Sequence, residues 1–508
     1  MKQNKLFIGL LLVFFLKQLF WLAIIPPTQA PDEYAHLSYV ESWYYEGRLP
    51  KLGETLITKR IEEASQSTSA GADSIFNKNT QSQLVTSGLA NAQKLEYQPG
   101  GQLNWIAQHP PVYYSLLKIF YPLVAEMDVN IGIFWLRISS VVLGLLTIIF
   151  TYLIVEIISK KKNNSQIEEN YLPLLVAGFL AFLPDFSFIS AVLNNDNLVL
   201  CLSSGLIYMV TELATSFKGK SDRKLYINGS LIAALIGLLL ITKATSLPVV
   251  AATVLFEIYF LVIKKRLHWL DLVKFFFMQF AIIMPMSSWW YIHNYYEFHV
   301  FLPDIATVIQ IHPEILTKHA YFATLFPEVT GAKNLISPYE FFITKNFFWN
   351  YFINIWGVFG AGFITLGAWQ IGAYIMLIMA ATVGYISQKL KRRLSPEKLK
   401  SIKSLTKLVP SSRSNQGPLN FYFILITVIL FGAITYKLFQ IAQSRGFLGA
   451  MHGRYFLPAM IPIGYWIFSG IQRLFKNRQN SWVVASFFLF FIVNEIVTMV
   501  TVIIPLFY

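Results

Sequence analysis

Long apolar runs constrain this chain more than any other feature of its sequence. Most are roughly 17 to 25 residues long, the length that a helix needs to cross the ~30 Å hydrocarbon layer of a membrane. A soluble domain could not accommodate a chain that is 55% hydrophobic and 16% aromatic with its apolar residues in such runs. The sequence therefore predicts an all-α polytopic membrane protein with about eleven transmembrane helices. These lie at about 6–26, 131–156, 171–190, 196–216, 227–242, 245–263, 270–291, 362–388, 419–441, 455–471 and 481–503.

The positive charges show how these spans are oriented. The 41 Lys and Arg residues exceed the 27 Asp and Glu residues, which in a soluble chain would suggest nucleic-acid binding. Here the cations occupy every second connection, which the positive-inside rule assigns to the cytoplasm. We therefore expect no nucleic-acid partner, a cytoplasmic N-terminus and a C-terminus outside. The clusters are Lys2 with Lys5, 160–162, 218–224, 264–266, 389–413 and 473–478.

Two connections on the opposite side are too long to be simple links, and long loops usually carry function or disorder. The first, residues 29–130, contains helix-like and amphipathic stretches around a Ser- and Asn-rich segment at 64–104. The second, 292–361, is rich in aromatic residues. We predict an N-terminal module, 1–291, and a C-terminal part, 292–508, that includes a basic cytoplasmic loop at 389–418.

An acidic pair, Asp32 and Glu33, follows the first span directly in the segment Pro31-Asp32-Glu33-Tyr34-Ala35-His36. Proline and carboxylates suit the first turn of a helix, so the pair could be a plain helix start. The spacing also places His36 on the same helical face as Asp32. On the outer side of the membrane, an ionised carboxylate could meet both lipid-borne and water-borne substrates.

Other polar residues recur at the outer ends of the spans. Lysine and arginine near helix ends can extend to the interface cheaply, and the Asn-rich segment could be an ordinary polar turn, so structural roles remain open. Two acids with several cations also suit a group transfer in which a lipid phosphate leaves. Outside the cell, the donor would have to be carried on a lipid. The candidate residues are His109, Arg137, Asn195, Asp196, Lys243, His452, Arg454 and Tyr455.

Six short motifs follow one another in register with this topology. They are Pro-Asp-Glu-x-Ala-His at 31–36, Pro-Pro-x-Tyr-Tyr at 110–114, the span with Arg137, Asn-Asp-Asn at 195–197, Thr-Lys-Ala-Thr at 242–245 and Gly-Arg-Tyr-x-x-Pro at 453–458. Together they resemble the GT-C fold glycosyltransferases. More narrowly, they look like a bacterial membrane branch related to protein O-mannosyltransferases and lipid A aminoarabinose transferases. The resemblance covers nearly the whole chain.

The resemblance implies an inverting transfer on the outer face from a polyprenyl-phosphate sugar, such as one on undecaprenyl phosphate. Asp32 takes the position of the catalytic acid, and Glu33 that of a helper or an organiser of the site. Lys243 would bind the donor phosphate, with Arg454 or Arg137. The acceptor would be a glycan or protein of the cell wall or surface.

Cofactors and other functions remain open. Some relatives need a divalent metal, but this chain has one cysteine, Cys201, no Asp-x-Asp in its first outer loop and no His-x-x-x-His. No residue is therefore predicted as a metal ligand, and a requirement for a divalent metal stays open. The alternative functions are a lipid or polysaccharide transporter or flippase and a non-catalytic assembly subunit. Transporters tend to place polar sites at the membrane midplane between repeats, and the sequence shows neither feature.

Overall fold

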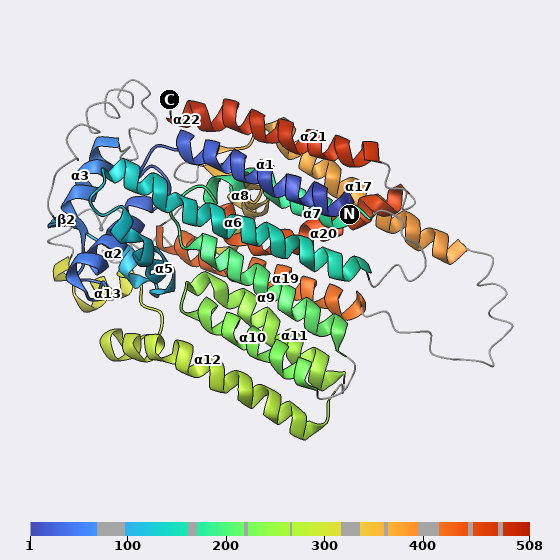
Figure 1. Ribbon diagram of the computed structural model, residues 1–508, viewed down its shortest axis with the longest axis horizontal. Helices are drawn as coiled ribbons and strands as arrows, with labels where there is room; N and C mark the ends of the chain where they lie inside the picture. The colour runs from blue at the N-terminus through green and yellow to red at the C-terminus, as the bar shows by residue number, and fades with distance from the viewer. Residues whose placement is uncertain are drawn as a thin grey trace.

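The computed structural model is an elongated bundle of helices with a small group of short elements at one end (Figure 1). It describes residues 2–68, 97–160, 170–217, 222–264, 267–315, 336–359, 364–394, 416–445, 451–475 and 481–507. In these residues, nine helices are long and apolar enough to cross a membrane, which confirms the predicted all-α, multi-pass architecture. The Ser- and Asn-rich segment and the basic loop fall largely outside the described residues.

Each predicted apolar run contains helix. The nine candidate spans comprise α1 (Lys2–Ile24), α6 (Val129–Lys160), α9 (Asp196–Ser216), α10 (Arg223–Leu240), α11 (Leu247–Glu257) with η4 (Ile258–Ile263), α12 (Trp269–Phe298), α17 (Ala368–Leu394), α19 (Gln416–Arg445), and α21 (Ser481–Thr498) with η8 (Met499–Ile503) and α22 (Ile504–Phe507). The other two runs form α7 (Leu172–Ala181) with α8 (Pro184–Ile189), and α20 (Leu457–Leu474).

The third apolar run differs from its prediction as one continuous span at 171–190. It breaks after α7 because Pro184, the first residue of α8, has no N–H with which to continue the helical ladder. Lys17 from α1 satisfies groups around the break, since its Nζ donates to the carbonyl of Ala181 and to Ser187 Oγ, both at 2.6 Å. A salt bridge of 3.0 Å to Glu495 balances the lysine charge inside the bundle.

The first long connection folds into a compact unit, which together with α13 (Ile305–Ile311) lies at one end of the bundle (Figure 1). We call this the loop end. At the centre of the compact unit, the Glu41 carboxylate binds Arg60, Thr58 and Tyr121. The unit comprises α2 (Glu33–Glu46), β1 (Leu56–Thr58), α3 (Lys59–Thr68), β2 (Pro99–Leu103), η1 (Trp105–Gln108), α5 (Val112–Phe120) and η2 (Tyr121–Leu123), with β1 and β2 antiparallel.

The described part of the second long connection packs beside the bundle. Asn354 Nδ2 donates to the Met451 carbonyl at 2.9 Å, and its own carbonyl lies against Gly453. A Cβ atom at Gly453 would stand 2.1 Å from that oxygen, so only glycine permits this approach. The elements here are η6 (Glu340–Thr344), α16 (Phe347–Asn354), and the antiparallel β3 (Val358–Phe359) and β4 (Ile364–Thr365).

The chain ends lie at opposite ends of the bundle, with the C-terminus at the loop end (Figure 1). This arrangement agrees with the prediction that the two termini lie on opposite sides of the membrane. Which end of the bundle faces outward stays a prediction. Helices of the two predicted modules pack on one another, since α20 contacts α7 and α19 contacts α11. The module boundary at 291 also stays a prediction.

Candidate functional site

A cavity of about 570 Å³ lies at the loop end, and we call it the central cavity. It is enclosed by the segment after η1, by the turn η3 (Ala244–Ser246), by the C-terminal part of α12 and by α19. Asp32, His109, Lys243 and Tyr455 contribute to its polar side. An apolar wall continues along α11 and α19, formed by Pro248, Leu430, Ala433, Ile434, Leu438 and Ile441.

Asp32 stands at the edge of this cavity in an unusual backbone conformation. Its φ of 62° lies in the left-handed region, which costs a non-glycine residue about 1 kcal/mol. Although it immediately precedes α2, its side chain makes no capping hydrogen bond to that helix, and 37% of it is exposed. The helix-start interpretation therefore does not account for this carboxylate, which lines the cavity instead.

Asp196 joins the two cations predicted to bind phosphate. Lys243 Nζ donates to Asp196 Oδ1 at 2.7 Å, and Arg454 Nε lies 3.2 Å from Asp196 Oδ2. All three side chains are buried. Arg454 Nη2 also lies 3.6 Å from Asp32 Oδ2. The arginine therefore connects the buried ion pair of Lys243 and Asp196 to Asp32 at the edge of the cavity. Tertiary structure thus brings together residues from four separate segments of the sequence.

The charges of this group cancel. Two carboxylates, Asp32 and Asp196, face two cations, Lys243 and Arg454. Protonation of Asp32 would leave one net positive charge among the four groups. In a largely buried site such a charge acts strongly on a bound anion, because the surrounding dielectric is low.

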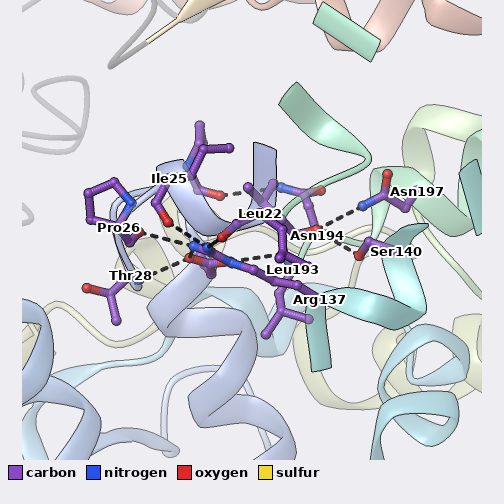
Figure 2. A network of polar contacts seen from close by, with 12 residues as sticks. Leu22, Ile25, Pro26, Thr28, Arg137, Ser140, Leu193, Asn194 and Asn197 are labelled. Atoms are coloured by element: carbon purple, nitrogen blue, oxygen red, sulfur yellow. Dashed lines mark hydrogen bonds and ion pairs between the residues drawn. The ribbon is translucent and has the colours of Figure 1, made fainter. Parts of the chain in front are cut away.

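Glu33 and Arg137 form a fully buried pair that is separate from the central cavity. Arg137 donates to both Glu33 oxygens at 2.8 and 2.6 Å. It also donates to the carbonyls of Leu22, Ile25 and Pro26 (Figure 2). The guanidinium thus makes five hydrogen bonds, its full donor capacity, and phosphate binding by Arg137 does not fit.

The Glu33 carboxylate is equally occupied. Besides Arg137, it accepts hydrogen bonds from the backbone N–H groups of Thr28 and Leu193, both at 3.0 Å. Its side chain has no exposed surface and does not line the central cavity. A direct catalytic role for Glu33 therefore does not fit the geometry, whereas the alternative of organising the site does.

His36 and Asn195 lie behind the cavity and meet at Tyr114. The Tyr114 hydroxyl is 2.9 Å from His36 Nδ1 and 3.4 Å from Asn195 Nδ2. Asn194 and Asn197 form the adjoining turn through hydrogen bonds to Pro31, Ile189 and Val192, part of which Figure 2 shows. The polar-turn interpretation thus accounts for these two asparagines, and the turn places Asp196 at the start of α9.

Three histidines around the cations are held neutral. Burial, together with nearby Lys243 and Arg454, lowers the pKa of His109 to about 3. Burial and Arg454 lower the pKa of His452 to about 3 as well. The pKa of His36 is also depressed well below its usual range, by burial and then by Lys243, His109 and Arg454.

Tyr455 completes the polar side of the cavity. Lys243 Nζ lies 5.6 Å from its ring centroid, and Arg454 Cζ lies 5.3 Å from it. The ring of His452 meets Tyr455 edge-on, with 6.0 Å between centroids. Since aromatic faces attract cations, Tyr455 helps to hold both cationic groups in place.

Two residues near the site were not predicted from the sequence. Tyr114 links His36 with Asn195. Its place in the Pro-Pro-x-Tyr-Tyr motif was the available signal in the sequence. Asp185 is a buried carboxylate that accepts a backbone hydrogen bond from Val358 and lies near Arg454 and Asp196. A carboxylate inside an apolar run, next to the helix-breaking Pro184, was the available signal for Asp185.

Comparison with protein families assigns the chain to a known group of membrane proteins. The model of the family described as "Predicted membrane protein (DUF2142)" matches residues 14–463, which include every residue of the candidate site. The chain belongs to this family. A search of curated proteins finds no match.

Two similar solved structures are of ArnT from Cupriavidus metallidurans. One is bound to undecaprenyl phosphate, with 12% sequence identity, a TM-score of 0.35 and coverage of 92% of this chain and 77% of that chain. The other is in the apo state, with 11% identity, a TM-score of 0.34 and coverage of 92% and 76%.

Proposed function

We propose that the protein is a membrane glycosyltransferase that moves a sugar from a polyprenyl-phosphate donor to a hydroxyl group of a cell-surface acceptor. The observation that carries this proposal is the central cavity, where Asp32 and Lys243 line a polar side that continues into an apolar wall. A base, a cation and a surface suited to a lipid chain thus face one space.

The two sides of the cavity suit the two parts of such a donor. The apolar residues of α11 and α19 would pack on the first isoprene units of the lipid. Isoprene units are pure hydrocarbon, so this contact removes apolar surface from water without burying any polar group. Lys243 would bind the phosphate, with Arg454 behind it, and Lys437 lines the same cavity from α19. Lysine and arginine are the usual partners of phosphate oxygens in proteins.

Asp32 would act as the general base. Its carboxylate takes the proton from the acceptor hydroxyl, and that oxygen forms a bond to the anomeric carbon from the face opposite the phosphate. The bond between the anomeric carbon and the phosphate oxygen breaks, and the electron pair leaves with the phosphate. The configuration at the anomeric carbon inverts.

The charge balance of the site supports this sequence of events. Before transfer, the four charges of Asp32, Asp196, Lys243 and Arg454 sum to zero. When Asp32 receives the proton, one net positive charge remains beside the departing phosphate as that group gains negative charge. The stabilisation therefore appears during the reaction, which is how an electrostatic contribution lowers a barrier.

The outward direction of the site is part of the proposal. Lys160 is the last residue of α6, which ends away from the loop end (Figure 1). Lys264 follows η4, and Arg473 lies in the last turn of α20; the helical segments that lead to them begin beside Lys243 and Arg454. By the positive-inside rule, the opposite end, with the central cavity, faces outside.

The test is a reaction of the purified full chain, in lipid nanodiscs, with a panel of polyprenyl-phosphate sugars and envelope acceptor. Release of free polyprenyl phosphate together with transfer of the sugar supports a transferase. A flippase would bind the same lipids and move them between leaflets without cleaving the sugar-phosphate bond. Lipid movement with no cleavage of any donor would overturn the proposal.

A further inference from the structure

Two further cavities lie near the central cavity at the loop end. The first, of about 320 Å³, shares Gln108, Trp290, Asn294 and Pro303 with the central cavity, and we call it the aromatic cavity. The second, of about 490 Å³, shares Lys51, Leu52 and Phe298 with the aromatic cavity, and we call it the acidic cavity. The three cavities therefore lie side by side, with the aromatic cavity in the middle and Asp32 in the wall of the central cavity.

The walls of the aromatic cavity suit a ligand with flat, weakly polar faces. Trp289, Trp290 and Phe298 line it from the C-terminal part of α12, together with His293. Trp290 and Phe298 are buried, whereas Trp289 is 42% exposed. Aromatic rings bury large areas with little loss of conformational entropy, and the C–H face of a sugar ring is a suitable partner for them.

The acidic cavity combines hydrogen-bond acceptors with a negative charge. Lys51 Nζ binds Glu54 at 2.9 Å and also binds Glu297, while His312 Nδ1 lies 3.2 Å from Glu314 Oε1. Three carboxylates thus accompany one ammonium group. Carboxylates accept hydrogen bonds from hydroxyl groups and repel phosphate or carboxylate polymers.

We propose that the aromatic and acidic cavities form the acceptor groove and that the acceptor is an uncharged glycan chain. This inference rests on the proposed function and adds the class of acceptor. The glycan enters at the acidic cavity, stacks its sugar rings on the aromatic walls and passes Trp290 and Asn294. Its terminal hydroxyl then reaches Asp32 opposite the donor phosphate.

The single native cysteine, Cys201, is buried, so an introduced cysteine can be labelled selectively. Glu54 is a suitable position because it lines the acidic cavity and its side chain is 58% exposed. Glu126, which is also exposed and lines none of the three cavities, gives a matched Glu126→Cys control. Both variants are labelled with maleimide-polyethylene glycol in nanodiscs.

Two reactions of the labelled proteins distinguish an effect on use of the donor from an effect on binding of the acceptor. The first transfers a radiolabelled sugar to delipidated envelope material of the producing organism, and the second transfers it to methanol, which does not need the groove. We expect the label on Glu54→Cys to slow envelope transfer about tenfold or more and to leave methanol transfer unchanged. The labelled Glu126→Cys protein should perform both reactions normally.

The product identifies the acceptor class. An uncharged glycan product is degraded by periodate, resists protease and is not retained on an anion exchanger. Label released by protease, label retained as an anionic polymer, or undiminished envelope transfer by labelled Glu54→Cys would each overturn this inference alone. Failure of the unlabelled parent to cleave any donor would overturn the proposed function and this inference together.

Discussion

Arg137 binds Glu33 in a bidentate ion pair that is buried from solvent, with donor–acceptor distances of 2.8 and 2.6 Å. The remaining Arg137 donors hold the carbonyls at the end of α1. One side chain of α6 thus joins the end of the first span to the start of α2. Because Asp32 is the neighbour of Glu33, this ion pair positions the proposed base.

Replacing Glu33 tests this positioning role. Glu33→Gln leaves the Arg137 charge buried without a counter-ion, so we expect a loss of about 3–5 kcal/mol in the free energy of unfolding. A lower melting temperature in detergent would show it. Glu46→Gln, which breaks the exposed Arg48–Glu46 pair, should change stability by less than about 1 kcal/mol. A Glu33→Gln protein of normal stability that had lost transfer would restore the catalytic role predicted from the sequence.

Asp32→Asn should remove the base without removing the fold. The carboxylate is partly exposed and caps no helix, so the melting temperature should stay close to that of the parent. Because the negative charge beside Arg454 is removed, the donor phosphate should bind at least as tightly as it does to the parent. Transfer should slow about 10²- to 10⁴-fold, the usual contribution of a general base. Asp304→Asn is the matched control, because Asp304 lines the same cavity and an asparagine can still cap α13. Near-normal turnover by Asp32→Asn would exclude Asp32 as the base.

Lys243→Gln should weaken stabilisation of the departing phosphate. We expect transfer to slow about 10²- to 10³-fold, as when one charge-stabilising donor is removed from other active sites. The measurement is kcat and KM for a polyprenyl-phosphate sugar, with Lys437→Gln as a comparison at the apolar wall of the same cavity. If Lys437→Gln were the more damaging change, the phosphate would be bound nearer to α19.

Asp196→Asn should make stability depend on the donor phosphate. The substitution leaves Lys243 and Arg454 buried without their shared counter-ion, so the melting temperature should fall. Added polyprenyl phosphate would supply the missing negative charge. It should therefore raise the melting temperature of Asp196→Asn by more than it raises that of the parent, as ligand linkage requires. Equal shifts would show that the lipid phosphate does not bind near these cations.

The buried histidines predict how stability depends on pH. Above about pH 6.5 His109 and His452 are neutral whether folded or unfolded, and they contribute no pH dependence. Between pH 6.5 and about 3 the unfolded chain binds protons that the folded protein does not, so stability falls as pH falls. Melting temperatures from pH 8 to pH 5 measure this loss.

His109→Gln and His452→Gln should each reduce the slope of melting temperature against pH. The exposed His268 provides the control variant, His268→Gln, which should leave that slope as it is. An unchanged slope in both the His109 and the His452 variants would mean that neither histidine is held neutral by the fold.

The sequence by itself determined the architecture. Each apolar run predicted a helix, because a chain in hydrocarbon must satisfy its backbone hydrogen bonds within the segment. The exception, the break between α7 and α8, had a local cause in Pro184, but its stabilisation by Lys17 involves a residue more than 160 positions away. A lysine inside the bundle needs buried partners, and only the tertiary structure shows that these are Ala181, Ser187 and Glu495.

Only the tertiary structure decided the roles of the charged residues. Asp32 and Glu33 are neighbours with nearly the same chemistry, yet one faces the central cavity and the other binds Arg137. Arg137 and Arg454 likewise look equivalent as arginines near helix ends. Whether a charge binds a substrate or its own protein depends on which groups lie within about 4 Å. That neighbourhood is set by the packing of segments hundreds of residues apart, which no local pattern in the sequence encodes.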